Sequence, residues 1–135
     1  MNDPFNNSEL TTILVVSNLK ASKTYYLDVL GAELFREYGG DSIVISLLGH
    51  WILLVTAGGP TEDKPGIRFE PPADKQRVSH SYTIRVDDCN RSYNLLKERG
   101  ANFLTPPVVR GAETRCFFRD PDGHLFEISE YRSNS

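Results

Sequence analysis

The chain has 135 residues, with fifteen basic and eighteen acidic side chains and a formal net charge of −3. This length fits one domain, and 39% hydrophobic with 24% charged residues is ordinary for a soluble globular protein. No basic tract stands out, which argues against a nucleic-acid partner. Apolar runs such as residues 13–16 and 51–55 are too short to span a membrane, and the N-terminus lacks a secretion signal. We therefore expect a cytoplasmic protein without a membrane partner.

The first part of the chain predicts a strand, a helix and three more strands. Residues 11–16 are rich in β-branched side chains and predict the first strand. Asn18 can cap a helix over residues 19–30, which ends at Gly31. Three strands are then expected at residues 33–38, 43–48 and 51–56, with turn residues between them.

Residues 58–79 have a different composition, with four prolines at positions 60, 65, 71 and 72, several charges and few apolar side chains. We interpret them as a connector, with a short extended piece at residues 67–69. A loop of this length without regular structure is more often functional than idle.

The second part repeats the plan of the first. Residues 80–86 predict a strand, Asp88 can cap a helix over residues 89–99, and Gly100 ends it. Short and longer strands are expected at residues 102–104, 113–118 and 125–129. The last two are joined by Asp120-Pro121-Asp122-Gly123, a strong turn signal.

The two parts also align in sequence. Val16-Ser17-Asn18-Leu19 matches Val86-Asp87-Asp88-Cys89, Tyr26 matches Leu96, and Gly49-His50 matches Gly123-His124. Recurring elements in one order indicate an internal repeat. We predict a single α+β domain over residues 1–135, made of two βαβββ modules in tandem: module one at about 9–57, the connector at 58–79 and module two at about 80–131.

The segments VVSNLKASKTYYLDVLGAEL and FFRDPDGHLFEIS resemble the glyoxalase/bleomycin resistance protein/dioxygenase superfamily, also called the vicinal oxygen chelate superfamily. The resemblance extends over residues 9–131. It implies that each module curls its mixed sheet into a half-cup, and that two half-cups form a small-molecule site within one chain or across a dimer. Open sheet edges also favour a homodimer.

In metal-dependent members of the superfamily, ligands lie on the first and last strands of each module. The resemblance maps these positions to Thr11, Leu53, Ser81 and Glu127. One carboxylate, two hydroxyls and an alkyl group disfavour a catalytic divalent metal. His80 lies one residue from the mapped position, and only a β-bulge would turn it inward. If a metal binds, Glu127 and His80 are the candidate ligands; otherwise His80 is an exposed histidine.

Glu127 alternates with Phe126 and Ile128, and therefore faces away from both. On a cup-lining face it would be a partly buried carboxylate, a candidate catalytic base or hydrogen-bond acceptor. The alternative is a carboxylate paired with Arg115 or Arg85. We assign His124 and His50 to the turns beside them.

Arg115 and Phe117 alternate onto one face of the neighbouring strand. If that face lines the cup, they supply a cation and an apolar wall for an anionic or aromatic ligand; otherwise Arg115 faces solvent. We place the ligand pocket on the concave face of module two, with Ser81, Arg115, Phe117 and Glu127 converging on it and Thr11 opposite.

Three functions stay open. The missing ligands favour a protein that binds or transforms a small organic ligand without a full metal-ligand set. The resemblance alone favours a metal-dependent lyase, isomerase or extradiol-type dioxygenase of the glyoxalase superfamily. The third is a chain with a vestigial site that serves assembly. Neither the substrate nor the reaction follows from these residues, so the question of an enzyme stays open.

Overall fold

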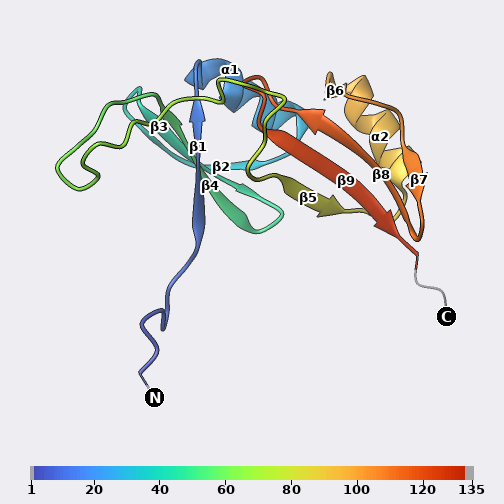
Figure 1. The fold of residues 1–135 in the computed structure, drawn as a ribbon, viewed down its shortest axis with the longest axis horizontal. Helices are drawn as coiled ribbons and strands as arrows, with labels where there is room; N and C mark the ends of the chain where they lie inside the picture. The colour runs from blue at the N-terminus through green and yellow to red at the C-terminus, as the bar shows by residue number, and fades with distance from the viewer. Residues whose placement is uncertain (1, 133–135) are drawn as a thin grey trace.

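The computed structural model describes residues 2–132, which form two mixed β-sheets lying side by side (Figure 1). Sheet one has the strand order β1-β4-β3-β2, and sheet two has the order β5-β9-β8-β6, with β7 also paired to β8. In chain order the elements are β1 (Thr11–Val16), α1 (Leu19–Thr24), the π-helical turn η1 (Tyr25–Val29), β2 (Glu33–Tyr38), β3 (Ser42–Leu47), β4 (His50–Thr56), β5 (Tyr82–Arg85), α2 (Cys89–Glu98), β6 (Asn102–Phe103), β7 (Val108–Arg110), β8 (Glu113–Arg119) and β9 (Leu125–Tyr131).

The two sheets have the same topology. In each, the first strand pairs in parallel with the last, β1 with β4 and β5 with β9. The remaining pairings are antiparallel. The α+β class and the tandem arrangement of βαβββ modules are therefore confirmed.

Both helices begin at the predicted caps. The side chain of Asn18 accepts a hydrogen bond from the backbone N–H of Ala21 at 3.0 Å. The side chain of Asp88 accepts one from the N–H of Arg91 at 3.1 Å. Each bond satisfies an N–H group that has no partner inside the helix. The first helix then differs from the prediction, because it changes to π geometry at Tyr25.

One hydrophobic core joins the two modules. Its centre is aromatic: Phe126 of β9 stacks between Phe118 at 5.3 Å and Tyr82 at 5.0 Å, measured between ring centroids. Tyr26, from the helical segment of module one, lies 6.1 Å from Phe126. Tyr26, Phe118 and Phe126 are all fully buried. Module two thus completes the packing of the first helix.

The turn between β8 and β9 is also hydrogen-bonded to module one. The Tyr26 hydroxyl donates to Asp120 at 2.6 Å, and the Ser17 N–H donates to Asp122 at 3.0 Å. The Nε2 atom of His124 lies 2.8 Å from the carbonyl oxygen of Val15. The backbone N–H of His124 donates to Asp120 of its own hairpin at 2.8 Å, and its ring in addition bonds to β1 of the other module.

Two local differences from the prediction are informative. Strand β7 was not predicted; it follows Pro106-Pro107, two residues without a backbone N–H to donate to a sheet. The strand predicted at residues 80–86 is shorter, so that His80 and Ser81 precede β5. In agreement with the extended piece predicted at residues 67–69, Phe69 pairs with Gly58 through two backbone hydrogen bonds of 2.8 and 3.0 Å. Among residues 2–132, no helix is long and apolar enough to cross a membrane.

Candidate functional site

The shared core and the helices cover one face of each sheet, and we call the opposite face the free face. In β8 and β9, Cys116, Phe118, Phe126 and Ile128 point into the core. The alternate residues of β5, β8 and β9 therefore lie on the free face of sheet two. Its central members are Thr83, Arg85, Glu113, Arg115, Phe117, Leu125, Glu127 and Ser129.

Glu127 is the most enclosed carboxylate of this free face, with 8% of its surface exposed. The hydroxyl of Thr83 donates a hydrogen bond to its Oε1 atom at 2.6 Å. The Nε atom of Arg115 lies 3.7 Å from its Oε2 atom. Of the two arginines proposed as partners for Glu127, the structure pairs it with Arg115.

A second group of charges continues the row across the sheet. Glu113 accepts a hydrogen bond from the Ser129 hydroxyl at 2.6 Å and one from Arg85 at 3.2 Å. The Nη1 atom of Arg115 lies 3.7 Å from the Glu113 carboxylate. The Ser129 hydroxyl, together with Arg85 and Arg115, holds the pKa of Glu113 below its ordinary value. The row therefore alternates in sign and carries two positive and two negative groups.

The structure brings together three of the predicted pocket residues. Arg115, Phe117 and Glu127 share the free face, and the Arg115 guanidinium lies 5.9 Å from the centroid of the Phe117 ring. Arg115 is only partly exposed, with 34% of its side chain accessible. This small group is the centre of the candidate site.

Ser81, Thr11 and His80 lie elsewhere. Ser81 is exposed and precedes β5, whereas Thr83 is the residue opposite Glu127. Thr11 is exposed on β1, opposite Trp51 of sheet one. The His80 ring lies 6.4 Å from the Tyr82 ring. Sequence reasoning missed Thr83, which the parallel register of β5 with β9 identifies.

The free face of sheet one is apolar by contrast. Ile13 lies opposite Leu53, the register position equivalent to Thr83 opposite Glu127. Phe35 is 59% exposed, and its ring meets Trp51 edge-on at 5.2 Å. The pair of Ile13 and Leu53 thus offers no polar group at the position where sheet two has Thr83 and Glu127.

The donor atoms near Glu127 do not fit a catalytic divalent metal. Across residues 2–132, no cluster of three or more His, Cys, Asp or Glu residues could hold a metal ion. The nearest polar partners of Glu127 are a hydroxyl and a guanidinium. The guanidinium beside the carboxylate repels a cation, whereas such a metal needs about three anionic or imidazole ligands.

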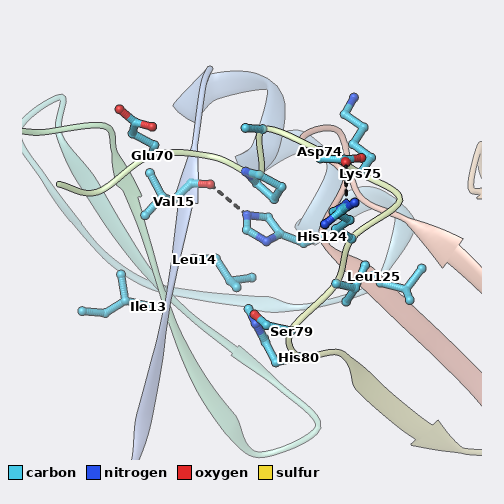
Figure 2. A pocket seen from close by; sticks show the side chains of 15 residues that line it. Ile13, Leu14, Val15, Glu70, Asp74, Lys75, Ser79, His80, His124 and Leu125 are labelled. Atoms are coloured by element: carbon cyan, nitrogen blue, oxygen red, sulfur yellow. Dashed lines mark hydrogen bonds and ion pairs between the residues drawn. The ribbon is translucent and has the colours of Figure 1, made fainter. Parts of the chain in front are cut away.

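A cavity of about 340 Å³ lies between β1, the connector and the β8–β9 turn. His80 and His124 both belong to its lining, which Figure 2 shows from close by. We call it the connector cavity. It is distinct from the row of charged residues on sheet two.

Comparison with known proteins decides the family. The model of the Glyoxalase/Bleomycin resistance protein/Dioxygenase superfamily matches residues 10–128. The chain belongs to this superfamily. A metallothiol transferase FosB from Staphylococcus haemolyticus is 33% identical over 116 residues, covering 84% of this chain and 76% of that protein.

Other superfamily relatives are more distant but cover more of the chain. A lactoylglutathione lyase from Neisseria meningitidis serogroup B is 26% identical over 133 residues, covering 92% of this chain and 91% of that protein. The crystal structure of a glyoxalase/bleomycin resistance protein/dioxygenase from Alicyclobacillus acidocaldarius has a TM-score of 0.69 at 20% identity, covering 99% and 97% of the two chains. This last similarity supports the fold.

Proposed function

We propose that this superfamily member binds a small organic ligand on the free face of sheet two, without a full set of metal ligands. The observation that carries the proposal is the enclosed carboxylate of Glu127, placed on the free face beside a cation and an aromatic ring. A few convergent polar groups beside apolar surface are typical of small-molecule sites. Thr11 and Ser81 are the more remote residues of this proposed site.

Arg115 is the group that a ligand would engage. Its two ion pairs, to Glu113 and Glu127, are both 3.7 Å long, which is beyond hydrogen-bond distance. A ligand oxygen can therefore bond to the guanidinium without breaking a strong contact, while Phe117 offers its ring to an apolar group. If a reaction follows, Glu127 is the residue in position to accept a proton.

The ligand is to be found by screening small organic acids and aromatic compounds against the wild-type protein. We expect Glu127→Gln and Phe117→Ala each to weaken the binding of a hit. Glu37→Gln is the matched control, because Glu37, on β2 of sheet one, forms an ion pair with Lys23 of α1. If neither test variant changes the affinity by more than about twofold, roughly 0.4 kcal/mol, the ligand binds elsewhere.

The alternative is a metal-dependent lyase, isomerase or dioxygenase, which the names of the lactoylglutathione lyases and metallothiol transferases support. The donor set around Glu127 speaks against it. We expect protein purified without a chelator or an affinity tag to contain far less than one transition metal per chain by mass spectrometry. A stoichiometric metal that is lost in Glu127→Gln would establish the alternative, with His80 as the next ligand to test.

We also propose a homodimer. The free face of sheet one exposes several apolar side chains. Phe35 is 59% exposed, Ile13 is 45% exposed, and Trp51 is partly exposed. Burial of such a face in a symmetric pair would remove apolar surface from water and close the half-cup of sheet two. Light scattering at micromolar concentration should give the mass of two chains, and the mass of one chain would contradict the proposal.

A further inference from the structure

The connector cavity has the size and lining of a small-molecule site. Its volume of about 340 Å³ falls within the usual range, roughly 300–1,000 Å³. Apolar surface predominates in its wall, which includes Ile13, Leu14, Val15, Pro72, Val78 and Leu125. The charged row on sheet two around Glu127 takes no part in this wall. The cavity is therefore a separate place for a ligand.

His124 gives the cavity a defined hydrogen-bond acceptor. The Val15 carbonyl, 2.8 Å from Nε2, can only accept a hydrogen bond, so Nε2 carries the proton. In the neutral ring, Nδ1 then presents a lone pair. Among residues 2–132 the structure shows no hydrogen-bond partner for Nδ1, and Figure 2 shows the ring lying between β1 and the connector.

The two acidic side chains of the cavity wall are held in ion pairs. Asp74 forms an ion pair with Arg77 at 3.5 Å, and Glu70 forms one with Arg68 at 3.2 Å. The side chain of Lys75 points away from His124 (Figure 2). Because Arg77 of the wall is paired with Asp74 and Lys75 is turned away, a charged ligand would enter this largely apolar space without a free counter-charge, which is unfavourable.

The connector is held over the cavity by a close contact with the β8–β9 turn. A Cβ atom built on Gly123 would lie 2.6 Å from Cγ of Lys75, and Gly123 has a φ of +95°. Arg119 adds a hydrogen bond to the Lys75 carbonyl at 3.4 Å. Glycine at position 123 thus allows Lys75 of the connector to pack directly against the β8–β9 turn.

We propose that the connector cavity is a second ligand site, which binds an uncharged ring compound that donates one hydrogen bond to Nδ1 of His124. The ring of the compound packs against the apolar wall, and its hydrogen-bond donor bonds to the lone pair on Nδ1 of His124. The paired charges explain the preference for an uncharged compound. This site is independent of the one around Glu127.

Phenol is the probe for this proposal, and anisole is its matched control, because anisole has the same ring without a hydrogen-bond donor. In NMR titrations of the isotope-labelled full chain, phenol should shift the methyl signals of Ile13 and Leu125 and the ring signal of His124. One hydrogen bond predicts binding of phenol roughly fivefold tighter than that of anisole. Benzoate should bind no tighter than anisole.

Two variants locate the binding. Ile13→Trp fills the cavity and should abolish the shifts caused by phenol, whereas Val44→Trp, on the same free face but outside the cavity wall, should retain them. Gly123→Ala should weaken phenol binding by displacing Lys75, and Gly40→Ala, which has room for a Cβ, should not. Equal affinities for phenol and anisole, shifts confined to Phe117, or full binding by Ile13→Trp would each overturn the proposal.

Discussion

In sheet one the parallel pair of β1 and β4 places Ile13 opposite Leu53, whereas in sheet two the equivalent pair places Thr83 opposite Glu127. The backbone arrangement is the same in both. Two alkyl groups meet in the first case, and a hydroxyl and a carboxylate 2.6 Å apart meet in the second. The free-face positions can therefore change their chemistry while the fold is kept.

The faces of the two sheets that the core covers are alike, because both carry buried apolar side chains. Ile52 of β4 and Phe126 of β9 occupy equivalent places after the matched Gly-His pairs, and both are buried. Their side chains hold the single core together. The two modules are therefore alike on the covered faces and differ at the pair of Ile13 and Leu53 against Thr83 and Glu127.

The largest expected effect comes from the covered faces. Phe126→Ala should lower the free energy of unfolding by about 3–5 kcal/mol, and Ile52→Ala by about 2–5 kcal/mol, because each leaves a cavity in the shared core. Chemical denaturation of both variants measures this. A loss below about 1 kcal/mol in either would show that the two covered faces are not equivalent.

Transferring the chemistry of sheet two to sheet one should have an intermediate effect. Leu53→Glu should lower the free energy of unfolding by about 1–3 kcal/mol. The residue opposite position 53 is Ile13, which cannot form a hydrogen bond or an ion pair with the new carboxylate. Adding Ile13→Thr recreates the pair of Thr83 with Glu127 and should recover roughly 1 kcal/mol. A double variant no more stable than Leu53→Glu alone would mean that the register pair does not act as a unit.

The smallest expected effect concerns Tyr26, a helix position at which the two modules differ, since Leu96 stands there in module two. Burial raises the pKa of Asp120, and the hydrogen bond from Tyr26 partly offsets this. Tyr26→Phe removes that bond and should cost about 1–2 kcal/mol near pH 7. The exposed Tyr38→Phe is the matched control.

The cost of Tyr26→Phe should also depend on pH. Because the pKa of Asp120 is raised in the folded state, its contribution to stability is fully present below the unfolded pKa, near 4, and is lost as the pH rises through the folded pKa. Without the Tyr26 hydroxyl this loss becomes larger. Denaturation at several pH values should therefore show a smaller difference from wild type near pH 4 than near pH 7, and a constant difference would contradict the role of Asp120.

Much of the fold follows from local patterns in the sequence. Apolar periodicity marks the strands, Asn18 and Asp88 mark the starts of the two helices, and the Asp120–Gly123 turn marks the last hairpin. These signals depend on residues close in the chain. The alternation around Glu127 likewise placed it on the face away from Phe126, next to Arg115 and Phe117.

The pairing of distant segments was decided by the tertiary structure alone. Alternation along β9 already indicates the face on which Glu127 lies, but the register of β5 against β9 selects Thr83 rather than Ser81 as its partner. The contact of His124 with β1 and the cavity under the connector arise in the same way. Register depends on how both modules pack around one shared core, and no local pattern contains that information.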